Sequence, residues 1–401
     1  MANRRPSEIP PTAGLPPRWR DLFPSAGDDL ATHAARLLGV ESVQVECSGT
    51  ACLVIALTAL HRLSGRRVVV VPAYTCPLVA IAVAHCGLEI RLCDLASDSI
   101  DVDSDRLKEA CDSDVLAVLP THLAGRVADV DPVLSIARAV GAYVIEDAAQ
   151  AFGARRGGRS VGLDGDAGFF SLAVGKGLTT YEGGLLVARD ATVREAFATV
   201  SRELAPPRIG WELRRSLELI GYHLFYRPSL LPLAYGVPLR RALRRDDPVD
   251  AVGDDFSNEI PLHSLGAWRR SVAARAIARW PAFQEECALQ AARRRIRLAK
   301  IEGLHVIDDH GDARGVWPFL LVMMRDRQAR DATLATLWGR GVGISRLFIH
   351  ALPEYAYLRS SVGEQPVPNA RAFAGRTLTI SNSPWLDDAT FERICEVLET
   401  S

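Results

Sequence analysis

Lysine is rare in this chain, and one lysine stands in an unusual setting. The 401 residues include 47 lysines and arginines, and only Lys108, Lys176 and Lys300 are lysines. Arginine stays protonated at physiological pH, whereas a lysine amine can become nucleophilic and form a Schiff base. Lys108 and Lys300 have charged neighbours in helix-like segments, which is typical of a solvated surface. Lys176 has glycine on both sides and no charged neighbour, so it is our candidate for covalent chemistry.

An acid and an anion-binding sequence could serve the same site. The apolar run before Lys176 ends abruptly in Glu146 and Asp147, which places carboxylates at the end of a predicted strand. Residues 48–50 read Ser-Gly-Thr and open an apolar run of helical length. The free N–H groups of a helix N-terminus bind anions, and Gly49 would let a phosphate approach the backbone closely. The alternative is that these residues only cap the helix.

Strand-like and helix-like segments alternate between residues 68 and 147. Strands that are apolar on both faces, separated by helices, predict a largely parallel sheet covered by helices on both sides. Ligands gather at the carboxyl ends of such strands. We therefore expect residues 48–50, Tyr74, His122 and Asp147 to meet at one edge of the sheet. Two further strands should flank Lys176.

The rest of the chain suggests five parts. We predict an extended arm (1–27), a large domain (28–202), an insertion (203–255), a bridging segment (256–300) with one long helix over 262–300, and a smaller α+β domain (301–401). The insertion combines large apolar residues, prolines and arginine clusters, without the roughly 18 apolar residues in a row that cross a bilayer. It could pack as a lid or at a subunit interface, or residues 205–245 could contact a membrane surface.

The composition of the chain indicates which binding partners and which cellular compartment to expect. A formal net charge of −1 provides no electrostatic footprint for nucleic acid. The eight cysteines show no C-x-x-C spacing, so we expect reduced thiols and no metal site. The N-terminal residues show no apolar region followed by a cleavage site. We expect a cytoplasmic protein. If the insertion contacts the membrane, the protein would be peripheral to the inner face of that membrane.

These features together suit pyridoxal 5'-phosphate, which needs a lysine for its aldehyde, a carboxylate for its ring nitrogen and a helix N-terminus for its phosphate. The sequence resembles the DegT/DnrJ/StrS family of pyridoxal-phosphate-dependent sugar aminotransferases, which have the fold type I of the aspartate aminotransferase superfamily. The matching segments are SGTACLVIALTAL, VPAYT, THLAGRVADVD, VIEDAAQAFGA, GDAGFFSLAVGKGLTTYEGG, GVGISRLF and LTISNSPWLDD. The resemblance implies a three-layer α/β/α large domain with a mostly parallel sheet and a smaller C-terminal α+β domain.

The resemblance also implies roles for individual residues. Lys176 would hold the cofactor as a Schiff base and later shuttle a proton between cofactor and substrate carbons. Asp147 would pair with the ring nitrogen, and Gln150 would meet the ring face or its 3-hydroxyl. The residues that would hold the phosphate are Gly49, Thr50, Ala51 and Ser171.

Two other matches concern the surroundings of this site. His122 corresponds to a histidine usual in the family, and it either supports the catalytic residues or is a buried structural histidine. Asn258 matches an asparagine that reaches the phosphate from the partner subunit, which implies a homodimer with shared active sites.

The sequence departs from the family pattern at two positions. Cys76 stands where an aromatic residue usually stacks on the cofactor ring, so Tyr74 would have to stack instead. Ile260 replaces an arginine two residues after Asn258. These departures predict an atypical substrate pocket.

The resemblance implies an aminotransferase that moves an amino group, expected to come from L-glutamate, onto a keto group of a nucleotide-linked sugar. Polysaccharide, lipopolysaccharide or glycosylated-metabolite biosynthesis would be the setting. Two alternatives stay open: an enzyme of the same fold with a lipid-linked or other non-sugar keto acceptor, and a non-catalytic regulatory or binding protein. The presence of Lys176 argues against the dehydratases of the family, which carry histidine there.

Overall fold

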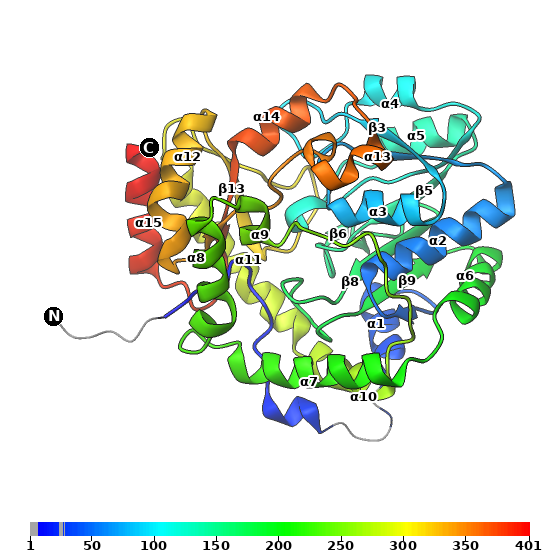
Figure 1. Ribbon diagram of the computed structural model, residues 1–401, viewed down its shortest axis with the longest axis horizontal. Coiled ribbons are helices and arrows are strands. Elements are labelled where there is room, and N and C mark those ends of the chain that lie inside the picture. The colour runs from blue at the N-terminus through cyan, green and yellow to red at the C-terminus, as the bar shows by residue number, and fades with distance from the viewer. Residues whose placement is uncertain (1–6, 24–26, 28) are drawn as a thin grey trace.

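The computed structural model describes residues 7–23, 27 and 29–401. They form a large α/β part and a smaller α+β part (Figure 1). The large sheet has, in spatial order, β1 (Gln44–Glu46), β9 (Gly184–Ala188), β8 (Ala167–Ser171), β5 (Tyr143–Asp147), β4 (Val115–Val118), β2 (Val68–Pro72) and β3 (Glu89–Cys93). Neighbouring strands from β8 to β3 run parallel, and the β8–β9 and β9–β1 pairs are antiparallel. The predicted mostly parallel sheet is confirmed.

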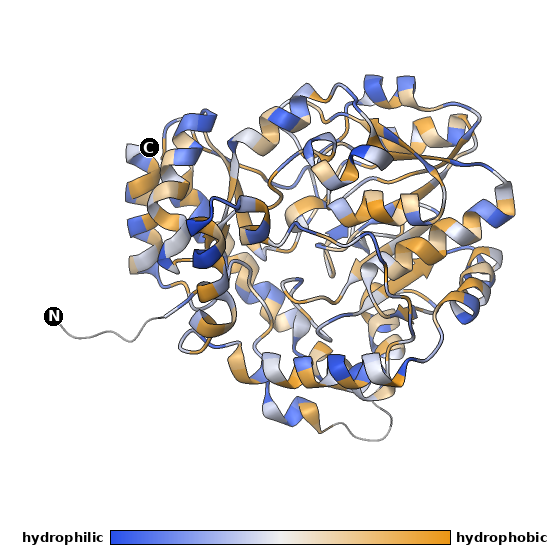
Figure 2. Cartoon of the chain, viewed as in Figure 1, coloured by the Kyte–Doolittle hydropathy of each residue, from blue (hydrophilic) through white to orange (hydrophobic). Residues whose placement is uncertain are grey.

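The strands are apolar on both faces because helices cover both faces. In β2, Val69 and Val71 enter one core with α2 (Gly49–Ser64) and α3 (Pro77–His85), while Val68 and Val70 enter another with α4 (Ser104–Ala110) and α5 (Asp131–Ala139). Figure 2 shows the hydrophobic character of α2 and α3. The helices of the large part are α1 (Leu30–Leu38), α2 (Gly49–Ser64), α3 (Pro77–His85), α4 (Ser104–Ala110), η2 (Leu123–Gly125), α5 (Asp131–Ala139) and α6 (Ala191–Leu204). A short hairpin joins β6 (Arg155–Arg156) to β7 (Arg159–Ser160).

The smaller part is an antiparallel sheet covered by helices. Its strands, in spatial order, are β10 (His305–Val306), β11 (Phe319–Met323), β13 (Thr377–Ser381) and β12 (Ile344–Ser345). Its helices are α12 (Arg327–Leu337), η4 (Trp338–Arg340), η5 (Leu352–Glu354), η6 (Ala356–Leu358), α13 (Arg359–Val362), α14 (Pro368–Arg376) and α15 (Asp388–Thr400). The expected α+β unit at the C-terminus is therefore present.

The expected single helix over 262–300 is two helices, α10 (Ala267–Ile277) and α11 (Trp280–Leu298). Pro281 explains the break, because its ring would clash with the carbonyl of Ile277 in a continuous helix. The N-terminal half of α11 packs in the core of the large part, and its C-terminal half packs in the core of the smaller part. The segment does connect the two parts, although the domain boundaries remain a prediction.

The arm and the insertion both lie on this body. The described arm residues bind it through backbone hydrogen bonds, such as Ala13 N to Pro318 O (2.6 Å) and Leu15 N to Gly177 O (3.1 Å), and end in η1 (Trp19–Leu22). The predicted arm residues 1–6 and 24–26 lie outside the described part. The insertion forms α7 (Ile209–Phe225), the π-helix η3 (Pro232–Gly236), α8 (Val237–Arg244) and α9 (Pro248–Val252).

All eight cysteines are free thiols, as predicted. Among the described residues, we find no helix with both the length and the apolar character needed to span a bilayer.

Candidate active site

A cavity of about 490 Å³ lies at the carboxyl ends of β2, β4 and β5, where the smaller part meets the sheet. Thr75 and Cys76 follow β2, Thr121 follows β4, and Asp147 ends β5. The opposite wall includes Phe319 of β11 and other residues of the smaller part. The pocket therefore lies at the carboxyl ends of the parallel strands, where the alternation of strands and helices in the sequence predicts a ligand site.

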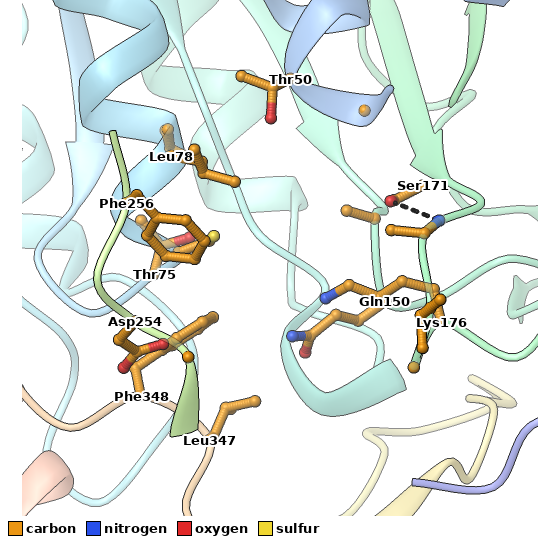
Figure 3. A pocket seen from close by; sticks show the side chains of 18 of the residues that line it. Thr50, Thr75, Leu78, Gln150, Ser171, Lys176, Asp254, Phe256, Leu347 and Phe348 are labelled. Atoms are coloured by element: carbon orange, nitrogen blue, oxygen red, sulfur yellow. Dashed lines mark hydrogen bonds between the residues drawn. The ribbon is translucent and has the colours of Figure 1, made fainter. Parts of the chain in front are cut away.

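Lys176 reaches this cavity from the loop after β8. Its two glycine neighbours have left-handed backbone angles, with φ of +87° at Gly175 and +91° at Gly177. A Cβ atom on Gly177 would also lie 2.2 Å from the Trp280 ring. Figure 3 shows the Lys176 side chain extending into the pocket beside Gln150. The glycines thus permit a tight loop that carries the amine into the cavity.

Asp147 presents a buried carboxylate to the same cavity. Its side chain is 4% exposed, and burial raises its pKa, while a hydrogen bond from Ala149 N (3.0 Å) and the Lys176 ammonium act in the opposite direction. A buried carboxylate of this kind is favourable only beside a cation or a hydrogen-bond donor. Asp147 is therefore suited to hold a protonated ring nitrogen.

His122 lies beneath the cavity rather than in its wall. Ala128 N donates a hydrogen bond to Nδ1 (3.2 Å), so the proton of the neutral ring is on Nε2, which donates to Glu146 Oε2 (2.9 Å). The backbone N–H of His122 also donates to Asp147 O (2.9 Å). With both ring nitrogens occupied, His122 can position the β5 end that carries Asp147.

Glu146 completes this buried pair. The carboxylate accepts backbone hydrogen bonds from Gly162 (2.8 Å), Asp164 (2.7 Å) and Gly165 (2.7 Å). Burial alone would raise the pKa of Glu146, but the hydrogen bonds from His122 and the backbone hold it below its usual value. Glu146 is therefore an ionised structural anchor and not a second acid in the cavity.

The N-terminus of α2, where we predict an anion cradle, lines the cavity. Ser48 caps the helix by accepting a hydrogen bond from Ala51 N (3.0 Å), while Ser48, Gly49 and Thr50 line the cavity. A Cβ atom on Gly49 would lie 3.1 Å from Cβ of Ser171, so this close approach favours glycine. Backbone N–H groups of the first helical turn have no partner within the helix and can bind a phosphate. Ala51 lies in the core behind the cradle.

Gln150 and Ser171 add polar groups to one wall. Gln150 Oε1 accepts a hydrogen bond from Ala124 N (2.7 Å), which fixes the amide orientation and leaves its NH₂ group for a ligand. Ser171 Oγ accepts a hydrogen bond from Ala173 N (3.3 Å; Figure 3), and its hydroxyl proton can be donated toward the cradle.

Like Ala51, two further predicted ligand residues lie outside the cavity wall. The Tyr74 side chain is 1% exposed and packs edge-on against Phe348 and Phe373, with its hydroxyl donating to Phe348 O (3.1 Å). Asn258 is exposed, while its neighbour Ile260 lines the cavity. Cys76 does line it, and burial raises the pKa of its thiol to about 12, which keeps the thiol protonated.

The cavity also contains residues that the sequence did not indicate. Asp254 and Phe256 lie on the wall opposite Lys176 and Gln150 (Figure 3). Asp254 is 3% exposed, and its Oδ2 accepts hydrogen bonds from Tyr355 Oη (2.7 Å) and Ile349 N (2.9 Å). Asp254 lies at the end of the insertion and Phe256 at the start of the bridging segment. The sequence signal there is an acidic pair close to the matched Asn258.

These residues fit pyridoxal 5'-phosphate. The cavity offers an amine from Lys176, a buried carboxylate from Asp147 and an oriented amide from Gln150, while Gly49 leaves room for a phosphate at the start of α2. Figure 3 shows the aromatic ring of Phe256 opposite Lys176 and Gln150. The sequence indicated Tyr74, and not Phe256, as the aromatic residue of the site.

Comparison with known proteins agrees with this description. A family model of the DegT/DnrJ/EryC1/StrS aminotransferase family matches residues 24–204 and 271–399. Protein MosB of Rhizobium meliloti is 39% identical over 148 residues, which are 37% of this chain and 29% of that protein. GDP-perosamine synthase of Caulobacter vibrioides is 36% identical over 143 residues, 36% of this chain and 38% of that protein. The chain thus aligns with about a third of the length of these relatives.

Longer alignments exist at lower identity. The spore coat polysaccharide biosynthesis protein SpsC of Bacillus subtilis is 24% identical over 373 residues, 91% of this chain and 86% of that protein. The pyridoxal-phosphate form of a putative sugar aminotransferase from Streptococcus pneumoniae superposes with a TM-score of 0.75 at 17% identity and covers 98% of both chains. The aminotransferase PseC of Helicobacter pylori gives a TM-score of 0.73 at 14% identity, also over 98% of both chains. The chain belongs to the DegT/DnrJ/EryC1/StrS aminotransferase family.

Proposed function

We propose that this protein is a pyridoxal-phosphate-dependent aminotransferase that transfers an amino group from an amino acid to the keto group of a nucleotide-linked sugar. The observation that carries the proposal is one cavity that joins Lys176, buried Asp147 and the N-terminus of α2. The relatives named GDP-perosamine synthase and SpsC support a role in polysaccharide biosynthesis. Lipopolysaccharide and glycosylated-metabolite pathways are related settings.

Four parts of the site would have separate roles in binding the cofactor and moving protons. Pyridoxal phosphate, when bound, supplies an electrophilic carbon and an electron-withdrawing ring. Lys176 would bind it covalently through Nζ, and after release the same Nζ would carry a proton between the cofactor and substrate carbons. Asp147 would keep the ring nitrogen protonated, and the first turn of α2 would hold the phosphate. His122 would position Asp147 through the backbone hydrogen bond described above.

The donor and the assembly are finer parts of this proposal. We propose L-glutamate as the donor, although several relatives are named L-glutamine:3-amino-2,3-dideoxy-scyllo-inosose aminotransferases, so glutamine is the direct competitor. We also propose a homodimer in which Asn258 reaches the partner's phosphate site, which its exposure permits. Contact of residues 205–245 with a membrane is likewise proposed, and α7 provides its structural basis.

Separate half-reactions test the function. The protein loaded with pyridoxamine phosphate should convert keto-sugar nucleotides, with return of the visible absorbance of bound pyridoxal phosphate, and glutamate should then restore the pyridoxamine form. Lys176→Ala should be inactive in both directions, whereas Lys108→Ala, which changes an exposed lysine paired with Asp105, should match the wild type. Conversion of small keto acids only would rule out the sugar acceptor.

The main alternative is a keto acceptor that is lipid-linked or not a sugar. Three relatives are named putative L-glutamine:3-amino-2,3-dideoxy-scyllo-inosose aminotransferases, and the acceptor in that name is not a nucleotide sugar. Here the exposed apolar face of α7 specifically favours testing a lipid-linked acceptor alongside the nucleotide sugars. A non-catalytic scaffold would show neither half-reaction.

A further inference from the structure

Helix α7 exposes an unbroken apolar stripe, which we call the α7 stripe. Three of its side chains are exposed by 61–86%, and the other two by 39% and 43%. At 100° per residue the five side chains fall within an arc of about 80°, and they extend along about 22 Å of the helix. An arrangement of this regularity differs from the scattered apolar residues of ordinary surfaces. The stripe consists of Ile209, Leu213, Leu217, Ile220 and Leu224.

The opposite face of α7 is bound to the body of the protein. Glu212 pairs with buried Arg269 of α10 (2.5 Å) and accepts a hydrogen bond from Gly266 N (3.0 Å). Leu219 is fully buried. The helix is therefore held along its length, and the stripe faces outward as a fixed feature.

The short helix η1 extends the apolar surface. Trp19 is 46% exposed and Phe23, which follows η1, is 74% exposed. The Trp19 ring lies 6.5 Å from the ring of His223 on α7, and Figures 1 and 2 show η1 beside α7 with hydrophobic stretches on both. Exposed tryptophan and phenylalanine beside an apolar stripe are typical of surfaces that enter the boundary between lipid headgroups and acyl chains.

The exposed charged side chains around the stripe have one sign. Over residues 18–23 and 208–227, every exposed charged side chain that the structure describes is an arginine: Arg18, Arg20, Arg208, Arg214 and Arg227. The carboxylates in these segments are less exposed and paired, Asp21 with Arg279, Glu212 with Arg269, and Glu218 with Arg214 and Arg215. The surface is thus apolar with a cationic border.

The arginine border distinguishes between two possible binding partners of the stripe, a second copy of the chain and an anionic bilayer. A second copy related by a two-fold axis would place one arginine border against another, and like charges across an interface are unfavourable. An anionic bilayer would instead pair its headgroups with the arginines and accept the stripe among its acyl chains. We propose that the α7 stripe and η1 dock on an anionic lipid surface, with α7 lying parallel to the membrane.

Docking at this face would take place next to the active site. Arg215, on the inner side of α7, pairs with Glu182 (2.5 Å), and Glu182 lines the cavity. One side chain thus links the proposed membrane helix to the wall of the pocket. The inference itself does not depend on the proposed activity, because lipid binding can be measured without a substrate.

The test is flotation of the full-length protein with vesicles of phosphatidylcholine alone and with added phosphatidylglycerol. We expect binding only to the anionic vesicles, weakening as salt rises. Leu213→Glu with Leu217→Glu should reduce the bound fraction at least tenfold. The matched control is Leu289→Glu on α11, where the native leucine is equally exposed at 61%, and it should bind like the wild type.

Other outcomes would overturn the proposal. They are absence of wild-type flotation with anionic vesicles at low salt, or equal binding by the double variant and the control. Loss of a lipid-free dimer in the double variant, seen by sedimentation velocity, would assign the stripe to a second copy. Thermal unfolding of each variant checks that the fold is retained, which the exposure of the substituted leucines leads us to expect.

Discussion

Asp254 gives the cavity a second buried carboxylate, on the wall opposite Lys176 (Figure 3). The pKa of Asp254 is raised, because burial has the largest effect. Hydrogen bonds from Tyr355 and Ile349 N and the charges of Arg346 and Lys176 act in the opposite direction. Both hydrogen bonds that the carboxylate accepts from the protein go to Oδ2. Its Oδ1 is therefore the atom with which it can bind a hydroxyl of the acceptor.

We expect Asp254→Asn to separate the two half-reactions. Hydrogen bonds to a charged group contribute about 1.5–3 kcal/mol, so the KM for the keto acceptor should rise roughly ten- to a hundredfold. The reaction with glutamate should stay within about twofold, because a small donor need not span the cavity. Asp255→Asn, at the exposed neighbouring position, is the control. Equal loss in both half-reactions would show that Asp254 has only a structural role.

Glu146 makes a pH-dependent contribution to stability. Because its pKa is lowered in the folded state, the stabilisation is complete above the unfolded value of about 4.3 and is lost as the pH falls through the lower folded value. Urea unfolding below about pH 4.5 should therefore show a steeper loss of stability for the wild type than for Glu146→Gln. Parallel pH profiles would contradict the assignment of Glu146 as an ionised anchor.

At the scale of elements, the loop that carries Lys176 depends on Gly177. An alanine there would combine a left-handed backbone with contact against Trp280, whereas Gly65, with φ +73°, has open space around its Cβ position. Gly65→Ala should cost about 1–2 kcal/mol of unfolding free energy. Gly177→Ala should cost at least about 1 kcal/mol more, since overpacking adds about 1–3 kcal/mol. Equal costs in urea unfolding would mean that the loop can move away from Trp280 freely.

The elements also show what the sequence can and cannot predict. Continuous apolar runs such as 68–72 predicted buried parallel strands because such strands are covered on both faces, and polar residues after them located the cavity edge. Asp254 and Phe256 could not be predicted, because they reach the cavity from a segment between α9 and α10 that has no regular secondary structure. Pro281 indicates the break between α10 and α11, but the helix-forming alanines and arginines around it favour the prediction of one continuous helix.

At the scale of the whole molecule, the proposed homodimer with shared active sites can be tested by mixing variants. If Asn258 completes the partner's site, mixing two inactive variants, Lys176→Ala and Asn258→Ala, should restore activity, because each mixed dimer contains one intact site. Random exchange predicts about a quarter of the wild-type activity. Sedimentation should give twice 43.6 kDa. A monomer, or a mixture without activity, would contradict the shared site.

The most direct test of the central claim is to locate the lysine that binds the cofactor. The chain has three lysines, so borohydride reduction in the presence of pyridoxal phosphate, followed by peptide mass spectrometry, has three lysines as possible targets. We predict modification of Lys176 alone, in the tryptic peptide 160–189, and none in Lys176→Arg. Attachment to Lys108 or Lys300 with Lys176 unmodified would contradict the assignment of this cavity as the active site.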